Sequence, residues 1–495
     1  MSQISVSNLT FSYEGSHDNV FEDVSFQIDT DWKLGFIGRN GRGKTTFMHL
    51  LMGKYEYSGN IFATVNFDYF PFEVTDKTQR TLSIIESIAP EAEQWQINRE
   101  VSLLDVDDDV LYRSFETLSN GEQTKILLAA LFLKENNFLL IDEPTNHLDI
   151  AARVTVCEYL KSKKGFILVS HDRQILDNCI DHVLSINKAN IELQRGDFSS
   201  WLVNKERQDG FEIAENERLQ RDIKQLDKAA KRAAKRSDDI EKTKYGGAKE
   251  SNNGLRVDRG FVGHKAAKMM KRSKVIEARQ LSAIEEKAGL LKNIENADNL
   301  KLSPLVHHAN RLINLDNIAV SYGEKTACSG VSFAVEQGDR IVLYGKNGCG
   351  KSSVLKLICG EEIAFTGTFQ SASGVVISYV PQDTSFLNGG LTEYASNHGI
   401  NESLFKAILR KLDFSRVQFE KDMTEFSEGQ KKKVLLAKSL CEKAHIYIWD
   451  EPLNFIDVLS RMQIEELLLT YKPTMVFVEH DSVFTEKIST KAISL

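Results

Sequence analysis

The sequence repeats three separated motifs at a nearly constant distance. FIGRNGRGKTTF (36–47) returns as LYGKNGCGKSSV (343–354), FLLIDEPTNHLD (138–149) as IYIWDEPLNFID (446–457), and FILVSHD (166–172) as MVFVEHD (475–481). Equivalent residues of the three pairs lie 307, 308 and 309 positions apart. Chance similarity does not preserve such spacing, so the chain contains a duplicated domain. We expect two related domains, residues 1–204 and 301–495, joined by a linker of residues 205–300.

Each copy is predicted to be an α/β domain. Its motifs contain short apolar runs such as FLLID and GFILVS, which are bounded by turns and helical stretches and are typical of buried parallel strands. By contrast, VFEDVSFQI (20–28) and KTACSGVSFAV (325–335) alternate apolar and polar residues. This alternation predicts antiparallel strands near the start of each copy.

Both copies contain the phosphate-binding pattern G-x-x-x-x-G-K-[ST] between an apolar strand and a helix-like run. The glycines let backbone N–H groups converge on phosphate oxygens at a helix N-terminus, and the lysine neutralises phosphate charge. The hydroxyl after the lysine is suited to ligate Mg²⁺. The candidate nucleotide-binding residues of these loops are Gly38, Asn40, Gly41, Gly43, Lys44, Thr45 and Thr46 in the first copy, and Gly345, Asn347, Gly348, Gly350, Lys351, Ser352 and Ser353 in the second.

Acidic residues follow the next motif strand of each copy. Asp142 and Asp450 end apolar strands, and carboxylates at such strand ends face the nucleotide crevice of an α/β sheet. We expect each to hold Mg²⁺ together with Thr45 or Ser352. The following glutamates, and the histidines that end the next strand, are positioned to polarise or orient the attacking water. These catalytic candidates are Glu143, Glu451, His171 and His480. The pattern predicts two sites that bind a nucleoside triphosphate with Mg²⁺ and hydrolyse it.

The motifs LSNGEQTK (118–125) and FSEGQKKK (426–433) resemble the LSGGQ signature of ATP-binding-cassette (ABC) domains. Their serines lie 23 residues before the strand-ending aspartates, in the order that the family has. The resemblance implies a monomer whose two halves sandwich two ATP molecules. In such a sandwich Ser119 and Gly121, and likewise Ser427 and Gly429, close on the γ-phosphate bound by the other half. It further implies that Tyr13 and Tyr322 stack on adenine and that Gln382 of YVPQ contacts the metal and water.

Three positions depart from the family pattern. In the first copy, Phe72 stands at the position equivalent to Gln382, where the family has a glutamine. In the second copy, Leu453 stands where the first copy has Thr145, and Glu428 replaces a glycine of the signature. Because both candidate catalytic glutamates remain, we expect two competent but unequal sites.

The linker carries an unusual concentration of positive charge. The chain has a net charge of -8, yet residues 221–274 contain 17 Lys and Arg against 7 Asp and Glu, a net of +10. Apolar residues recur at spacings of three and four from Leu219 to Ile240 and again from Leu281 to Leu291, which predicts an antiparallel helical hairpin. The alternative is a helical spacer that lies along the domains. Glycines interrupt the predicted tip, residues 242–264, where Tyr245, Phe261 and His264 are suited to stack on bases.

Two ABC domains joined by a basic helical linker resemble the ABC-F family over essentially the whole chain. Motifs including KYGGAK and AAKMMKRSK are similar to its Lsa-type antibiotic-resistance branch. The resemblance implies a 70S ribosome partner, with the linker inserted from the E site past the P-site tRNA toward the peptidyl-transferase centre of 23S rRNA. It implies protection against lincosamides, pleuromutilins and streptogramin A.

Several alternatives remain open at the level of sequence. They are a housekeeping ABC-F translation factor without a drug phenotype, the energising subunit of a membrane transporter, and a DNA-repair type of ATPase. The sequence has no apolar run of about 20 residues and no secretory signal at its start, so we expect a cytoplasmic protein without a membrane partner.

Overall fold

We describe a computed structural model of the chain. It describes residues 3–15, 19–145, 148–187, 190–245, 300–323, 325–346 and 348–495, together with Lys268, Lys271, Val275 and Arg279. These residues fall into two compact units, one comprising Met1–Trp201 and Ala297–Leu495 and the other Leu202–Asn296. Within the first unit we call the residues up to Trp201 the first half and those from Leu300 onward the second half.

The first half contains a six-stranded sheet of order β5-β6-β7-β3-β8-β9 and a three-stranded antiparallel sheet of order β2-β1-β4. In the larger sheet only the β8–β9 pair is antiparallel. The strands are β1 (Gln3–Phe11), β2 (Phe21–Asp29), β3 (Lys33–Ile37), β4 (Ser58–Ala63), β5 (Asn66–Phe70), β6 (Asn137–Asp142), β7 (Phe166–Val169), β8 (His182–Asn187) and β9 (Asn190–Arg195). The helices are α1 (Lys44–Leu51), α2 (Thr81–Ile88), α3 (Gln94–Leu103), α4 (Asn120–Phe132), α5 (Ile150–Ser162) and α6 (Arg173–Cys179), with 3-10 turns at Asp108–Tyr112 and Phe115–Thr117.

The second half repeats this plan with a five-stranded parallel sheet of order β14-β15-β16-β12-β17 and an antiparallel sheet of order β11-β10-β13. The strands are β10 (Arg311–Tyr322), β11 (Lys325–Glu336), β12 (Arg340–Tyr344), β13 (Ala364–Ser371), β14 (Ile377–Val380), β15 (Ile446–Asp450), β16 (Met475–Val478) and β17 (Lys491–Ser494). The helices are α9 (Lys351–Ile358), α10 (Leu391–Asn397), α11 (Glu402–Lys411), α12 (Glu428–Cys441), α13 (Val458–Tyr471) and α14 (Ser482–Ile488), with 3-10 turns at Arg416–Glu420 and Met423–Glu425.

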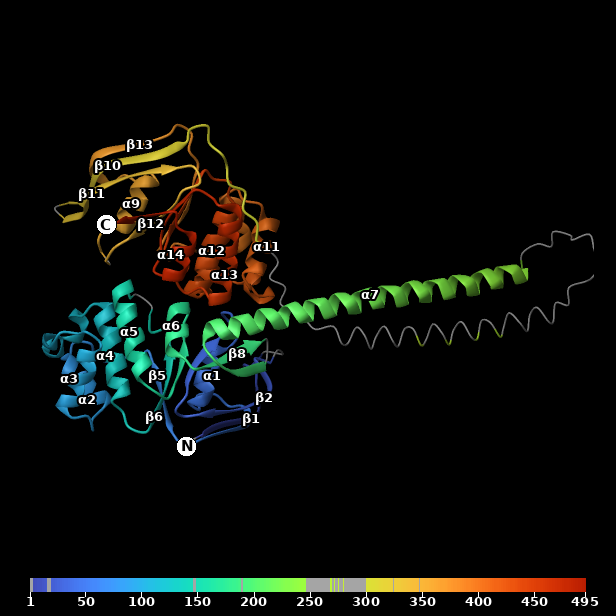
Figure 1. Cartoon of the computed structure of the whole chain (residues 1–495), viewed down its shortest axis with the longest axis horizontal. Helices are drawn as coiled ribbons and strands as arrows, with labels where there is room; N and C mark the ends of the chain where they lie inside the picture. The colour runs from blue at the N-terminus through green and yellow to red at the C-terminus, as the bar shows by residue number, and fades with distance from the viewer. Residues whose placement is uncertain are drawn as a thin grey trace, which may run out of the picture. The chain divides into compact units, whose positions relative to one another are not determined.

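The parallel sheet of the second half is buried on both faces. Alternate residues of β15 enter different hydrophobic cores: Ile446 and Ile448 pack with α9 and the antiparallel sheet, whereas Tyr447 and Trp449 pack with α12 and α13. Figure 1 shows the resulting order of layers, with α9 between the antiparallel sheet and β12 and with α12, α13 and α14 on the other side. Burial on both faces explains why these strands read as continuous apolar runs.

The predicted fold class, two tandem α/β ATPase domains, is confirmed. The antiparallel strands predicted over 20–28 and 325–335 are present as β2 and β11, and the glycine loops join β3 to α1 and β12 to α9. Equivalent strands of the two halves hold equivalent motifs. The carboxyl ends of β3, β6 and β7, and those of β12, β15 and β16, therefore carry the candidate site residues.

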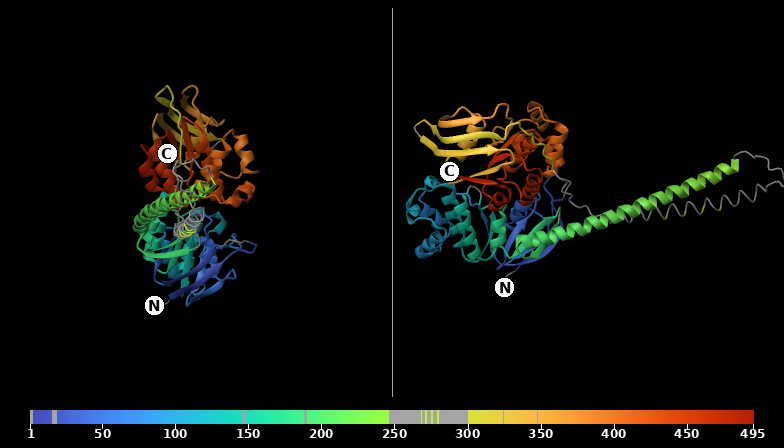
Figure 2. Two further views of the ribbon diagram at one scale, coloured as in Figure 1. Left: turned by 90° about the vertical axis from the view of Figure 1, so that its right-hand side faces the viewer. Right: turned by 45° about the horizontal axis from the view of Figure 1, so that its top comes forward.

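Helix α7 (Phe198–Tyr245) is one unbroken helix of 48 residues, which at ~1.5 Å per residue is about 70 Å long (Figures 1 and 2). The apolar spacing that predicts this helix begins only at Leu219, within a linker expected from residue 205, whereas the observed helix begins at Phe198. The helix is longer because its first turn is held in place by Phe198 and Trp201, which are buried. Most of the predicted tip and return arm, including Phe261, His264 and residues 281–291, lies outside the described residues. Lys268, Lys271, Val275 and Arg279 are helical and exposed.

Among the helices that the structure describes, none combines the length and apolarity needed to cross a bilayer.

Candidate active site

The two glycine loops are built alike. Gly43 and Gly350 cap the N-termini of α1 and α9 with φ values of 97° and 94°, a conformation that side chains disfavour. A Cβ at Gly43 would lie 2.6 Å from Val20, and one at Gly350 would lie 2.8 Å from the carbonyl oxygen of Ala327. Glycine is therefore required at both positions, as the sequence pattern predicts.

The loop lysines are buried at the centres of their loops. Lys44 donates from Nζ to the carbonyl oxygens of Gly38 (2.6 Å) and Arg39 (3.2 Å), and Lys351 donates to those of Gly345 (2.9 Å) and Lys346 (3.0 Å). Burial lowers the pKa of Lys44 against the opposing effect of Asp457. Each ammonium group is thus held by backbone carbonyl oxygens within its own phosphate loop.

The strand-ending aspartates lie beside the loop hydroxyls. Asp142 Oδ2 accepts hydrogen bonds from Thr45 Oγ1 and the Tyr69 hydroxyl, both at 2.9 Å. Asp450 is hydrogen-bonded to Ser352, and burial raises the pKa of Asp450 to about 6. Its Oδ1 atom is buried and has no hydrogen-bond partner among the described residues. A carboxylate beside a hydroxyl is the oxygen donor set that Mg²⁺ prefers, and the orphaned oxygen fits a cation there.

A glutamate and a histidine meet in each half. Glu143 Oε1 lies 3.2 Å from His171 Nε2, and Glu451 Oε1 lies 3.3 Å from His480 Nε2. Both glutamates have positive φ values, 52° and 47°, and their N–H groups donate to Val169 and Val478 of the adjacent strands. This strained but anchored backbone fixes each carboxylate at the end of its strand.

The surroundings of the two glutamates differ. Burial, and secondarily the neighbouring Asp142 carboxylate, raises the pKa of Glu143 to about 8. Burial also favours the neutral form of Glu451, but the hydrogen bond with His480, together with the charges of His480, Lys432 and Lys351, outweighs it, so the pKa of Glu451 lies below its ordinary value. Gln382 (2.9 Å) and Asn454 (2.6 Å) also donate to Glu451 Oε2. The two candidate bases are therefore chemically unequal.

The signature motifs begin helices. Ser119 and Ser427 cap α4 and α12, each in a capping box with the residue three positions on. The helix dipole and free N–H groups of such N-termini attract anions. Gly429 packs so closely against residues 454–457 of its own half that an added Cβ would lie 2.5 Å from the Phe455 carbonyl oxygen.

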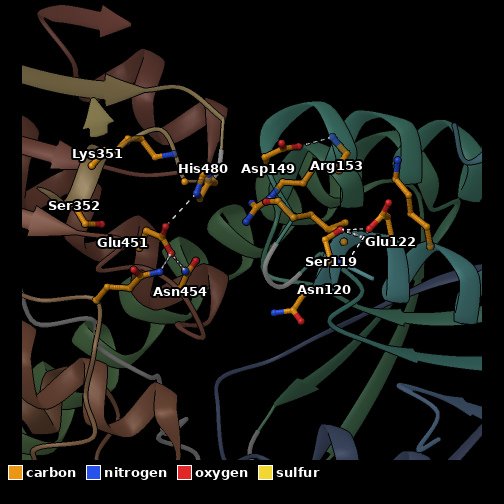
Figure 3. A pocket seen from close by; sticks show the side chains of 18 of the residues that line it. Ser119, Asn120, Glu122, Asp149, Arg153, Lys351, Ser352, Glu451, Asn454 and His480 are labelled. Atoms are coloured by element: carbon orange, nitrogen blue, oxygen red, sulfur yellow. Dashed lines mark hydrogen bonds and ion pairs between the residues drawn. The ribbon is translucent and has the colours of Figure 1, made fainter. Parts of the chain in front are cut away.

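Two of the cavities between the halves contain the phosphate loops. The Lys44 cavity, about 510 Å³, is lined by the first phosphate loop and by the signature of the second half. The Lys351 cavity, about 820 Å³, is lined by the second phosphate loop and by the signature of the first half. Figure 3 shows Lys351, Ser352, Glu451 and His480 on one side of this cavity, with Ser119 and Glu122 of the other half facing them. Each phosphate loop thus lies opposite the signature of the other half.

Most of the candidate residues line these cavities. The Lys44 cavity contains Tyr13, Asn40, Gly41, Gly43, Lys44, Thr45, Thr46, Asp142, Glu143, His171, Ser427 and Gly429. The Lys351 cavity contains Ser119, Gly121, Tyr322, Gly348, Gly350, Lys351, Ser352, Ser353, Gln382, Glu451 and His480. Gly38, Gly345 and Asp450 do not line them. Asn347 is outside the described residues.

Sequence reasoning missed several contacts at these sites. The Tyr69 hydroxyl donates a hydrogen bond to Asp142. Asn40 of the first phosphate loop donates from Nδ2 to the Phe455 carbonyl oxygen of the other half (2.7 Å). The repeated YFP and YVP segments could have indicated Tyr69. No pattern in the sequence indicates contacts between residues of different halves.

Phe72, which stands at the position equivalent to Gln382, is 38% exposed and does not line the Lys44 cavity.

Comparison with known proteins agrees with this geometry. A family model described as ABC transporter matches residues 21–146 and 328–454. The ribosome protection protein VmlR of Bacillus subtilis (strain 168) is 26% identical over 492 residues, which cover 96% of this chain and 84% of that protein. The energy-dependent translational throttle protein EttA of Haemophilus influenzae is 24% identical over 525 residues, covering 95% and 88%.

A solved structure shows the same fold. The crystal structure of the complex of archaeal ribosomal stalk protein aP1 and archaeal ribosome recycling factor aABCE1 aligns with 98% of this chain and 87% of that chain. Its TM-score is 0.62 and its sequence identity 17%, a level that establishes the fold alone. Because the family model matches both halves and both halves carry the phosphate loop, the chain belongs to the ABC transporter family and is an ATPase with two ATP-binding domains.

Proposed function

We propose that this protein is an ABC-F ATPase of the cytoplasm that binds the 70S ribosome and protects it from antibiotics of the peptidyl-transferase centre. ATP closes the two halves and favours binding, and hydrolysis releases the protein. The linker enters from the E site, near the P-site tRNA. The drug classes proposed are lincosamides, pleuromutilins and streptogramin A.

The observation that carries the proposal is the segment between the two ATPase halves. It provides an unbroken helix of 48 residues within a region whose residues 221–274 carry a net charge of +10, while the whole chain is acidic. A basic segment of this kind suits the phosphates of a large RNA, and a helix of this length suits a deep binding site. The relative VmlR is a ribosome protection protein by name, which supports the same function.

We propose that ATP is bound and hydrolysed in the Lys44 and Lys351 cavities, by residues of both halves. Lys44 and Lys351 bind the phosphates, and Ser119 and Ser427 close on them from the other half. Glu143 and Glu451 accept the proton of the attacking water, while His171 and His480 orient it. Mg²⁺, held by Asp142 with Thr45 and by Asp450 with Ser352 and near Gln382, neutralises phosphate charge when bound.

Cosedimentation with purified 70S ribosomes tests the partner. The double variant Glu143→Gln, Glu451→Gln should bind ribosomes in an ATP-dependent manner and inhibit translation, because its clamp closes but does not hydrolyse ATP. The same variant is mixed with membrane vesicles and with duplex DNA as controls. Weak, ATP-independent ribosome binding would contradict the proposal, and selective binding to vesicles or DNA would favour the transporter or DNA-repair alternative.

Drug tolerance tests the protective role. Expression in a susceptible bacterium should raise the tolerated concentrations of lincomycin and tiamulin, whereas Lys44→Ala, Lys351→Ala at equal abundance should not. If the abundant wild-type protein changes neither concentration yet binds ribosomes, the protein is a translation factor without a drug phenotype. The relative EttA, an energy-dependent translational throttle protein by name, supports this second candidate function.

A further inference from the structure

The Lys44 and Lys351 cavities are built from equivalent elements, yet they differ in the side-chain contacts between the phosphate loop and the opposite half. Asp105 follows α3 and Asp413 follows α11, at equivalent positions of the two halves, and both have positive φ values of 51° and 64°. Each aspartate lines the cavity that its half forms with the phosphate loop of the other half. The backbone thus presents an equivalent carboxylate to both phosphate loops.

Only one of these carboxylates meets arginine. Arg42 Nη2 of the first phosphate loop lies 3.1 Å from Asp413 Oδ1, and Arg39 Nη1 lies 3.9 Å from the same atom. In the second phosphate loop the residue equivalent to Arg42 is Cys349. A thiol does not form an ion pair with a carboxylate, so the Lys351 cavity lacks the counterpart of the Arg42–Asp413 pair.

A second set of contacts ties the same wall of the Lys44 cavity. Besides donating to the Phe455 carbonyl oxygen, Asn40 lies with its backbone nitrogen 3.5 Å from Asp457 Oδ2. Asp457 is buried and paired with Lys433 at 3.1 Å. Lys125, the equivalent of Lys433, instead donates to the backbone carbonyl oxygen of Asp105 at 3.4 Å. These contacts join the first phosphate loop to the opposite half a second time at the Lys44 cavity, whereas residues 347 and 147, the counterparts of Asn40 and Phe455, lie outside the described residues.

We propose that the Arg42–Asp413 pair is a latch that slows nucleotide release at the Lys44 site, so that the Lys351 site exchanges nucleotide faster. Both cavities have walls from both halves, so nucleotide leaves when those walls separate, and the pair opposes separation at one cavity only. The smaller volume of the Lys44 cavity, about 510 Å³ against about 820 Å³, agrees with this. The proposal rests on the ATPase activity and not on a ribosomal partner.

The size of the effect follows from exposure. The side chains of Arg42 and Asp413 are 32% and 21% exposed, so solvent screens part of their attraction. Partly exposed ion pairs contribute modestly, and we expect the loss of this one to speed release roughly three- to fivefold.

Release is timed on the full-length protein in the Glu143→Gln, Glu451→Gln background, so that hydrolysis does not intervene. The protein is loaded with a fluorescent ribose-labelled ATP and Mg²⁺ and then chased with excess unlabelled ATP. We expect two phases of equal amplitude. Arg42→Cys, which copies the second loop, and Asp413→Asn should each speed the slower phase and leave the faster one unchanged.

The reciprocal variant Cys349→Arg places an arginine opposite Asp105 and should slow the faster phase, a gain that misfolding cannot imitate. Lys421→Ala removes an exposed positive charge that lines neither cavity and serves as the matched control. A single release phase in the parent, or a slow phase that Arg42→Cys and Asp413→Asn do not change, would overturn the proposal.

Discussion

At the scale of single residues, two glycines of the signature motifs occupy very different surroundings. A Cβ on Gly429 would lie 2.5 Å from the Phe455 carbonyl oxygen and 3.2 Å from Asn40 Nδ2, whereas one on Gly121 would meet, among the residues that the structure describes, only Leu148, at 3.5 Å. We expect Gly429→Ala to destabilise the protein by about 1–3 kcal/mol, because backbone atoms must move. Gly121→Ala should change stability by less than about 1 kcal/mol. Calorimetric unfolding of both variants measures the difference, and equal midpoints would contradict it.

Equivalent lysines of the signature helices also differ. Lys433 and Asp457 form a pair in which the side chains are 2% and 1% exposed, whereas Lys125 bonds a backbone carbonyl group. Lys433→Met leaves the Asp457 carboxylate buried without its cation, and we expect a loss of about 3–5 kcal/mol. Lys125→Met should cost about 1 kcal/mol. Thermal midpoints of the two variants provide the test, and a larger fall for Lys125→Met would refute the assignment.

These lysines show what sequence can and cannot predict about the site. Repeated motifs predict which residues bind phosphate, because a phosphate loop needs glycine, lysine and hydroxyl groups at fixed spacing. They do not predict that Lys125 and Lys433, at the same motif position, have different partners. Nor do they predict the contact of Arg42 with Asp413, since residues 371 positions apart meet only through the packing of the two halves.

At the scale of elements, the long helix α7 is only partly predictable from the sequence. The 3-4 spacing of apolar residues predicts its existence but not where it begins. Its start depends on the burial of Phe198 and Trp201, a tertiary effect that no local pattern records. The strands were easier to predict, because burial on both faces leaves long apolar runs in the sequence.

Gly210, inside α7, offers a test of helix continuity. Nothing lies within 4 Å of a Cβ built there, so a side chain fits without steric conflict. Gly210→Ala should stabilise the helix by about 1 kcal/mol, and Gly210→Pro should break it at a cost of about 3 kcal/mol. We expect the proline variant to keep basal ATPase activity but to lose ribosome binding, whereas the alanine variant keeps both. Undiminished ribosome binding by a folded proline variant would show that helix continuity is not needed.

At the scale of the whole molecule, positive charge is concentrated in one segment of an otherwise acidic chain. The net charge of -8 conceals +10 on residues 221–274, which leaves -18 on the remainder. An acidic protein with one basic segment is repelled by RNA except where that segment binds. Affinity for the ribosome should therefore decrease steeply as salt increases, because each phosphate neutralised releases counterions.

The exposed residues Lys268, Lys271 and Arg279 allow this account to be tested quantitatively. Changing all three to glutamine should reduce the slope of log affinity against log salt concentration by roughly 2, since each phosphate contact contributes about 0.7. The matched control changes Lys421, Lys443 and Lys472, which are exposed on the second half, and removes the same charge. If both triple variants lower the slope equally, net charge and not the linker governs binding. A slope altered only by the linker variant assigns the phosphate contacts to that segment.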